Sequence, residues 1–166
     1  MSFAAGFGIR DKSATLHDVA DAIDDLAIPH HCVAWRNTFQ AIPSSVNTKI
    51  QLNSTYIDPF GLFDGANGRI TISRSGAYHI AYNCGLDDNV NGMVFQLTLM
   101  RNGSGVHIAS VSLARTMDAN VGSSVILSLQ AGDYLEIYLF HTAGSPQNTF
   151  GAAIYRPRIN LLQVSQ

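Results

Sequence analysis

From Cys32 onward the sequence alternates between apolar and polar residues in short runs. Turn-forming residues separate these runs, among them Asn102-Gly103 and residues 130–133. A period of two places successive side chains on opposite faces of a β-strand, so that one face can be buried. Short strands at intervals of roughly 8–12 residues are typical of a sandwich or a jelly roll. The runs that we expect to form strands are 33–39, 48–52, 69–73, 78–82, 93–101, 106–111, 124–129, 134–140 and 150–155.

The chain carries little charge for its size. Only 13% of its 166 residues are charged, and the net charge is −2; the usual charged fraction is about 25%. Because 46% of the residues are hydrophobic, the chain is too apolar for a disordered protein. The near-neutral balance excludes a broadly basic nucleic-acid binder. Weak repulsion between copies favours assembly with other protein surfaces.

The sequence predicts neither export nor insertion into a membrane. Residues 1–9 lack a basic leading region and a long apolar stretch. No window approaches the ~18 apolar residues that a membrane span requires. Cys32 and Cys84 are too few for a disulfide framework and lack metal-ligand spacing, so we expect buried free thiols. These features favour folding in a reducing cytoplasm.

Residues 1–31 differ in character from residues 32–166, which we expect to form the head. Residues 13–27 predict a short helix whose apolar positions recur at spacings of three, four and three: Leu16, Val19, Ile23 and Leu26. This helix either packs on its own domain or forms a short oligomer seam, which needs a larger oligomeric body because two heptads are marginal alone. The preceding apolar arm, with Phe3 and Phe7, is either an anchor for a partner's groove or a loose terminus.

One stretch has the spacing of a known signature, in which an Asn or Asp is followed by an aromatic residue, a Phe, and Gly-x-Tyr-x-Phe-x-aromatic. Five residues match this signature by type: Asp58, Phe63, Gly76, Tyr78 and Tyr82. The sequence therefore resembles the complement component 1q (C1q) globular-head family of the tumour necrosis factor-like (TNF-like) superfamily. Leu52, Ile70 and Ile80 replace phenylalanines of the signature without a break in spacing.

The resemblance extends over roughly residues 33–157, and it implies a fold. The segments 95–103 and 123–133 are similar to hairpins of the family, and 148–155 is similar to its last strand. The resemblance implies an all-β, ten-stranded jelly-roll sandwich that packs as a homotrimer and serves recognition and assembly rather than catalysis. Gly76 would allow a turn that a side chain would obstruct. The C-terminal extension 158–166 alternates enough to add a strand to a neighbouring sheet edge.

Few other residues indicate chemistry. Residues 87–92 offer oxygen ligands in the style of a calcium site, but these residue types are ordinary in turns. His30 and His31 could meet their symmetry mates on a trimer axis and hold a metal, although we expect solvated linker histidines. Glu136 has no evident paired carboxylate, and no catalytic motif is present, so we predict no enzyme activity, metal or cofactor. Scattered arginines are expected to be solvated or to pair between subunits: Arg69, Arg74, Arg101, Arg115, Arg156 and Arg158.

Together these expectations predict that the chain is a virion structural protein of a bacteriophage. We expect a trimeric capsid decoration (cement) protein on the capsid surface, assembled in the host cytoplasm. Its arm and helix would bind the major capsid protein or another virion protein. A first alternative is the receptor-binding tip of a short tail fibre, which would grip a glycan or protein of the host surface. A second alternative is a bacterial surface module for adhesion or ligand binding.

Overall fold

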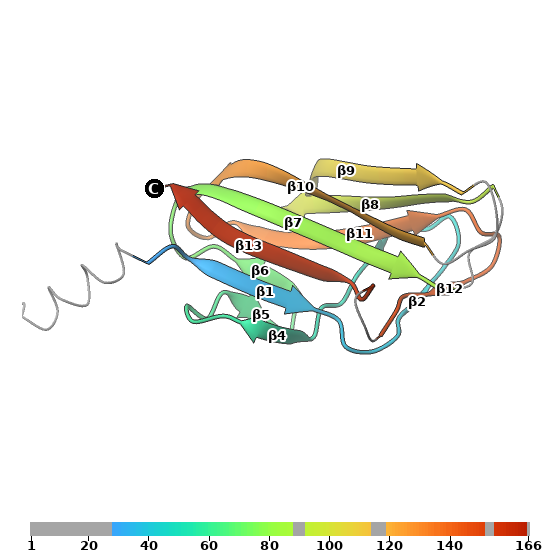
Figure 1. The fold of residues 1–166 in the computed structure, drawn as a ribbon, viewed down its shortest axis with the longest axis horizontal. Coiled ribbons are helices and arrows are strands. Elements are labelled where there is room, and N and C mark those ends of the chain that lie inside the picture. Colours follow the sequence, from blue (N-terminus) through green and yellow to red (C-terminus); the bar gives the residue numbers. More distant parts are fainter. Residues whose placement is uncertain (1–27, 88–91, 114–118, 152–154, 166) are drawn as a thin grey trace, which may run out of the picture.

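The computed structural model describes residues 28–87, 92–113, 119–151 and 155–165. These residues form an all-β, jelly-roll-like sandwich without a helix (Figure 1). They contain thirteen strands rather than the expected ten, because several pairings are only two residues long. The strands are β1 His31–Trp35, β2 Ala41–Ile42, β3 Thr48–Lys49, β4 Ser54–Ile57, β5 Phe63–Asp64, β6 Arg69–Thr71, β7 Gly76–Leu86, β8 Val94–Arg101, β9 Ser104–Ser112, β10 Ala119–Leu129, β11 Tyr134–His141, β12 Gln147–Asn148 and β13 Arg158–Ser165.

One layer of the sandwich is a five-stranded antiparallel sheet in the order β10-β7-β13-β1-β4. Its central strand, β13, pairs with β1 through His31 and Leu162 and with β7 through His79 and Leu162. The prediction that residues 158–166 extend a neighbouring sheet edge is therefore wrong. An alternating run fits any strand position, and here both edges of β13 are occupied within its own sheet.

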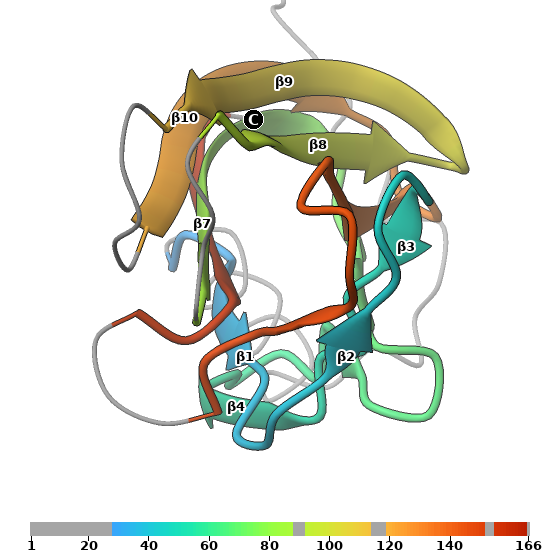
Figure 2. The same ribbon diagram turned by 90° about the vertical axis from the view of Figure 1, so that its right-hand side faces the viewer.

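The second layer is a six-stranded sheet that follows the order β5-β6-β11-β8-β9, with β3 paired to β11. A separate pair, β12-β2, lies at one side of the sandwich. Figure 2 shows the two layers end on, with β9 beside β10 where the edges of the two sheets meet. The sandwich therefore has a lateral edge at which strands of both sheets are exposed.

The hydrophobic core fills the space between the two sheets. From the five-stranded sheet, Tyr78, Ile80 and Tyr82 point inward, and all three are buried. Leu97 of β8 and Ile137 of β11 face them from the other layer and are completely buried. Burial of a large apolar side chain contributes about 1.5–3 kcal/mol, so this alternation supplies the main driving force for the fold.

The structure confirms two predicted turns. Asn102 and Gly103 both have positive φ, 52° and 80°, as a tight β8–β9 hairpin requires. Between β10 and β11, the carboxylate of Asp133 accepts a hydrogen bond from the backbone N–H of Gln130 at 2.8 Å. The expected strand 150–155 is not observed among the described residues, since Phe150, Gly151 and Tyr155 lie outside strands.

Both ends of the described chain lie at the same end of the sandwich. The antiparallel pairing of β1 with β13 puts the start of β1 beside the end of β13, at the left of Figure 1. Trp35 and Arg158, which pair with each other, lie at the other end of this strand pair. The predicted arm and helix, including Phe3, Phe7, Leu16, Val19, Ile23 and Leu26, lie outside the described residues.

Candidate functional site

Asp58 and Phe63 of the signature shape the turn that precedes the second sheet. The Asp58 carboxylate accepts hydrogen bonds from the backbone N–H groups of Leu62 and Phe63, at 2.7 and 2.9 Å. An aspartate that caps its own turn in this way fixes the local backbone without a partner strand. Phe63 is half-buried and packs against the core. Both residues therefore have structural roles, Asp58 in the turn and Phe63 against the core.

Gly76 begins β7 at a point where two backbones nearly touch. A Cβ atom at this position would lie 2.3 Å from the carbonyl oxygen of Ser165 and 2.6 Å from Nε2 of Gln163. Its φ of 156° is also one that other residues rarely adopt. The atoms that a side chain would meet belong to the end of β13, so the absence of a side chain at Gly76 allows β13 to pair closely with β7.

Tyr78 and Tyr82 place their rings in the core and their hydroxyl groups at its boundary. The Tyr78 hydroxyl donates to the carbonyl oxygen of Arg74 at 2.6 Å, and the Tyr82 hydroxyl lies 2.7 Å from Nδ1 of His107. Burial raises the pKa of Tyr82 to about 12. Both hydroxyl groups stay protonated near neutral pH and serve packing rather than proton transfer.

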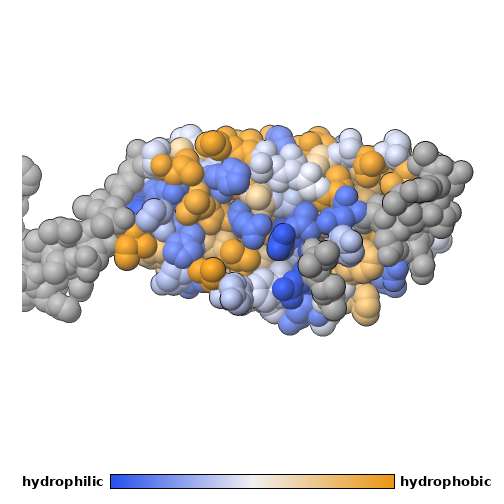
Figure 3. All heavy atoms as spheres, in the orientation of Figure 1, coloured by the Kyte–Doolittle hydropathy of each residue, from blue (hydrophilic) through white to orange (hydrophobic). Residues whose placement is uncertain are grey.

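The outward face of the five-stranded sheet carries apolar side chains in contact with water. The pairing register aligns Ile126, His79, Leu162 and His31 in one row across four strands. Ile57, Leu162 and Val164 are exposed on or beside β13 and β1, and we call them the face patch. In Figure 3, which shows this side of the molecule, hydrophobic residues lie among hydrophilic ones.

A second group of exposed apolar side chains lies at the lateral edge formed by β9 and β10. Val106 and Ile108 belong to β9, and Ile126, which is 61% exposed, belongs to β10. We call these three residues the edge patch. The edge patch lies on β9 and on the edge strand β10, whereas Leu162 and Val164 of the face patch lie on the central strand β13.

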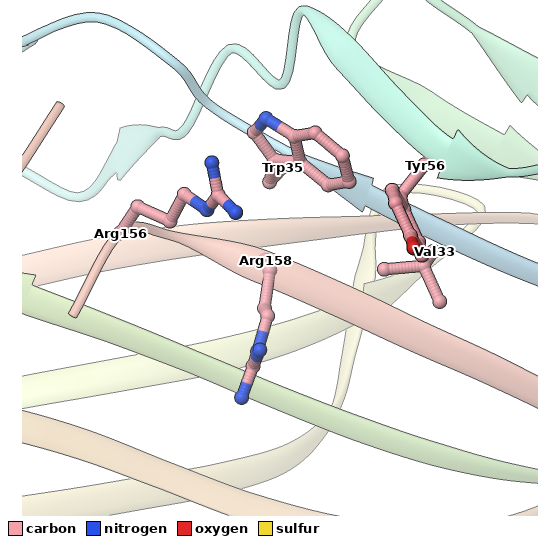
Figure 4. A pocket seen from close by; sticks show the side chains of 5 residues that line it. All are labelled: Val33, Trp35, Tyr56, Arg156 and Arg158. Atoms are coloured by element: carbon pink, nitrogen blue, oxygen red, sulfur yellow. The ribbon is translucent and has the colours of Figure 1, made fainter. Parts of the chain in front are cut away.

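A small pocket of about 180 Å³ opens on the outward face near Trp35 (Figure 4). It is lined by residues of β1, β4 and β13 and by the residue preceding Pro157: Val33, Trp35, Tyr56, Arg156 and Arg158. The Arg158 guanidinium points away from Trp35, toward Asn83 of β7 (Figure 4). We call this set the arginine pocket. The Arg156 guanidinium lies over the Trp35 ring, 4.4 Å from its centroid.

Sequence reasoning did not single out the arginine pocket. Its residues lie as far apart as Val33 and Arg158, and only the strand register brings them together. Two signals pointed to it: the single tryptophan of the chain at an outward position of β1, and two arginines on either side of Pro157.

His30, which precedes β1, differs from the expected solvated linker histidine, whereas His31 is half-buried. His30 is buried, its ring stacks on Phe60 with centroids 4.0 Å apart, and its Nδ1 lies 2.9 Å from the Ser73 hydroxyl. The solvated interpretation is wrong for His30, because Phe60 and the end of β13 cover it. Gln163 donates its backbone N–H to the His30 carbonyl oxygen at 2.7 Å.

Charged side chains of the six-stranded sheet pair within the chain. The Lys49 ammonium group contacts the buried Glu136 carboxylate, and Arg101 contacts Asp133 at 2.7 Å. Burial acts to raise the pKa of Asp133, but hydrogen bonds from Gln130, Asn102 and Arg101 outweigh it and lower the pKa below its ordinary value. The expectation that arginines are solvated or pair between subunits is therefore wrong for Arg101 and for Arg69, which contacts Asp64 at 3.2 Å.

The described residues contain no group of three or more His, Cys, Asp or Glu side chains that could hold a metal ion. Of the candidate loop 87–92, residues 88–91 lie outside the described part. Cys32 and Cys84 are free and buried, as expected. Burial, followed by the charge of Asp58, raises the pKa of Cys32 to about 12, and burial also raises that of Cys84. Within the described ranges no helix is long and apolar enough to cross a membrane.

Comparison with solved structures shows which folds this head is similar to. The globular domain of zebrafish complement 1qA protein superposes with a TM-score of 0.62 at 17% identity, over 81% of this chain and 97% of that one. Eiger TNF from S. frugiperda gives 0.62 at 14% identity, over 82% and 93%. Murine APRIL gives 0.62 at 9% identity, over 82% and 99%. These likenesses establish the fold.

Sequence comparison adds one phage-related protein. The chain is 28% identical over 109 residues to "Phage-like element PBSX protein XkdV" of Bacillus subtilis (strain 168), a match that covers 61% of this chain and 16% of that protein. This chain therefore corresponds to a small part of a much longer relative.

The family assignment rests on the sequence of the head itself. Residues 33–154 match the C1q domain, and this range includes Asp58, Phe63, Gly76, Tyr78 and Tyr82. The match ends before β13, although β13 is the central strand of the five-stranded sheet. The sandwich of two sheets agrees with the C1q and TNF structures that superpose on it. The chain thus belongs to the C1q domain family.

Proposed function

We propose that this chain is a virion structural protein that forms a homotrimer and decorates the capsid of a bacteriophage as a cement protein. The observation that carries the proposal is the presence of two separate apolar patches on one C1q-type head. C1q and TNF proteins are typically homotrimers, which supports self-association. The phage-element relative and the C1q domain are compatible with a phage virion protein.

The proposed trimer would cover both patches. In a closed ring each subunit uses two different surfaces, one toward each neighbour. We propose that the edge patch of one subunit, around Ile108 and Ile126, packs on the face patch of the next, around Leu162. Because two different surfaces would meet, a three-fold rather than a two-fold axis would relate the copies.

Attachment to the capsid is assigned to residues 1–31. The described chain starts and ends at one end of the sandwich, so an anchor there leaves the other end of the head free to face outward. In this proposal Phe3 and Phe7 contact the major capsid protein or another virion protein. Leu16, Val19, Ile23 and Leu26 line the seam between the three helices.

The trimer is tested by light scattering of the purified full-length chain. We expect Ile126→Asp to reduce the measured molar mass from that of three chains to that of one chain, because three charges would be buried at the interfaces of the trimer. Val46→Asp is the control, since Val46 is also apolar and exposed but lies in the loop between β2 and β3. A monomeric unaltered chain would contradict the trimer, and loss of the trimer in both variants would contradict the assigned patch.

The capsid role is tested by the location and copy number of the protein in purified particles. Cryo-electron microscopy and quantitative mass spectrometry should find hundreds of copies on the capsid. A variant without residues 1–27 should form the trimeric head but no longer bind the shell. If this truncated head still binds, the anchor assignment is wrong.

A receptor-binding tip on a tail fibre is the second candidate. One observation favours it: in the phage-element relative, the matching segment is only 16% of a much longer chain. A small number of copies confined to the tail would support this candidate and contradict decoration.

A further inference from the structure

His79 differs from the other histidines of the described chain in its hydrogen bonding. One ring nitrogen in each of four other imidazoles lies 2.7–2.9 Å from an oxygen of the same chain: His30, His31, His107 and His141. No hydrogen bond joins the half-buried imidazole of His79 to another described residue. In a single head its ring nitrogens therefore exchange hydrogen bonds with water, and a surface that covers β7 would remove that water.

The pairing register puts His79 between two residues of the proposed trimer contact. It lies directly opposite Ile126 of β10 on one side and Leu162 of β13 on the other, and directly opposite residues share a face of the sheet. The backbone of His79 is thus about 5 Å from that of each contact residue. In the proposed ring, Ile126 packs on one neighbouring copy and Leu162 on the other. A closed ring would therefore cover His79 in every subunit and bring its three copies toward the common axis.

No ionisable side chain lies next to His79 on the described part of this face. The nearest outward positions on β7, β10 and β13 hold small or uncharged residues: Ala77, Ala81, Ser124, Ser128, Asn160 and Val164. Beyond these positions the groups are basic. His31 follows Leu162 in the same row, and Arg158 lies four residues before Leu162 on β13 and donates to Asn83. A protonated His79 would thus have positive rather than negative neighbours.

The edge patch that would cover His79 offers no counter-charge either. The outward positions of β9 and β10 carry serine, asparagine, glycine, valine or isoleucine, and none of these is ionisable. Two basic groups border this edge. The His107 ring turns inward to the Tyr82 hydroxyl. Arg101 donates to a carbonyl oxygen of β10 at 3.3 Å and is already paired with Asp133. A charged imidazole between the two surfaces would therefore be buried without a partner, which is unfavourable.

From these features we infer that acid opens the trimer, because assembly requires the His79 imidazole of each subunit to be neutral. Histidine is the side chain that ordinarily changes its charge between about pH 5 and 8. In a free head the charged imidazole is hydrated, whereas in the ring it meets apolar contacts and its own symmetry copies. Free heads then bind more protons than the ring, so association weakens as the pH falls. The inference rests on the proposed homotrimer and adds its regulation, and it is independent of the capsid role.

Sedimentation equilibrium of the full-length chain at several protein concentrations measures the association constant between pH 7.5 and 5.0. The buffer contains EDTA, so that no metal ion bridges the imidazoles. If each head must release one proton to assemble, the constant for three chains should fall by up to about 10⁴-fold over this range. Return to pH 7.5 should restore the trimer. Circular dichroism checks that the heads remain folded at pH 5.0.

Variants show whether His79 is responsible. His79→Gln cannot gain a proton, so its association constant should fall by less than about 100-fold over the same range. His79→Lys carries a charge at every pH of the test and should weaken association at least about 100-fold already at pH 7.5. His107→Gln is the matched control, because it removes a histidine that lies behind the edge patch rather than in the contact. It should keep the acid response of the unaltered chain.

Three results would overturn the inference while leaving the proposed homotrimer intact. The first is a trimer with the same association constant at pH 7.5 and 5.0. The second is a folded His79→Gln trimer with the full acid response. The third is unfolding of the heads over the same pH range, which would assign the loss of the trimer to the fold. A chain that is monomeric at pH 7.5 would instead contradict the proposed homotrimer itself and the inference with it.

Discussion

The two sheets of the head differ in where their charged and exposed apolar side chains lie. Among the described residues, the ion pairs Lys49–Glu136, Arg69–Asp64 and Arg101–Asp133 all involve the six-stranded sheet or its turns. The outward face of the five-stranded sheet instead carries the face patch and two arginines without a carboxylate partner among those residues. The ion pairs are therefore concentrated at the six-stranded sheet, whereas exposed apolar side chains occur on the five-stranded sheet and on β9 at the lateral edge.

The largest effect that this contrast predicts is on assembly. Leu162→Asp in the face patch should abolish the trimer at about 10 μM protein, because a charge would be buried against the neighbouring edge patch. The stability of the single head should change by less than about 1 kcal/mol, since Leu162 faces outward. Sedimentation velocity measures the first effect and urea unfolding of the monomer the second. A folded Leu162→Asp trimer would show that the two faces do not differ in this way.

The ion pairs of the six-stranded sheet predict a smaller effect, on stability. Glu136→Ala should lower the free energy of unfolding by about 1–3 kcal/mol, because it leaves the Lys49 ammonium half-buried without its partner. The double variant Lys49→Met with Glu136→Leu should recover most of this loss, since it removes both charges. Urea unfolding of the single and double variants measures the difference. Equal stability of the single variant and the unaltered chain would contradict the importance of the buried pair.

Asp133 predicts a dependence of stability on pH. Its pKa is lower in the folded than in the unfolded state, so the carboxylate stabilises the fold above the unfolded value of about 3.9. This contribution disappears as the pH falls through the folded pKa. Asp133→Asn should therefore be less stable than the unaltered chain at pH 6, and the gap should narrow towards pH 2. Unfolding curves across this range check the sign, and a gap that widens in acid would contradict it.

The smallest predicted effect is a difference in stability between two arginine variants: one of Arg158, which has no ion pair among the described residues, and one of Arg101, which pairs with Asp133. Arg158→Gln should change the free energy of unfolding by less than about 0.5 kcal/mol, as is usual for an exposed residue outside an ion pair. Arg101→Gln should cost about 1 kcal/mol, because Asp133 is buried and loses its partner. Chemical unfolding of both variants under the same conditions makes the comparison. Equal losses would show that the pocket arginines also stabilise the head.

Local patterns in the sequence were sufficient to predict much of the fold. The alternation around Tyr78 and Tyr82 identified β7, and Asn102-Gly103 identified the β8–β9 hairpin, because strand periodicity and turn chemistry depend on neighbouring residues. The two-residue strands β2 and β12 were missed, since two residues contain no period. The position of β13 was also mispredicted, because periodicity does not specify which strands become its neighbours.

The candidate sites were harder to predict than the strands. Lys49 and Glu136 are 87 positions apart in sequence, and Trp35 and Arg156 are farther still. Such pairs are created by the strand register, which a single sequence does not encode locally. His30 was misread for the same reason, since Phe60 and Gln163 reach it only after the sheets have formed.

The central position of β13 has a consequence for synthesis of the protein. Among the described strands, β1 and β7 are joined in the five-stranded sheet only through β13, which is translated after both of them. Until residues 158–165 have been translated, the β10–β7 pair and the β1–β4 pair have no common neighbour within that sheet. Completion of the head therefore follows translation of its last strand, and the face patch comes together in the same step that closes the sheet.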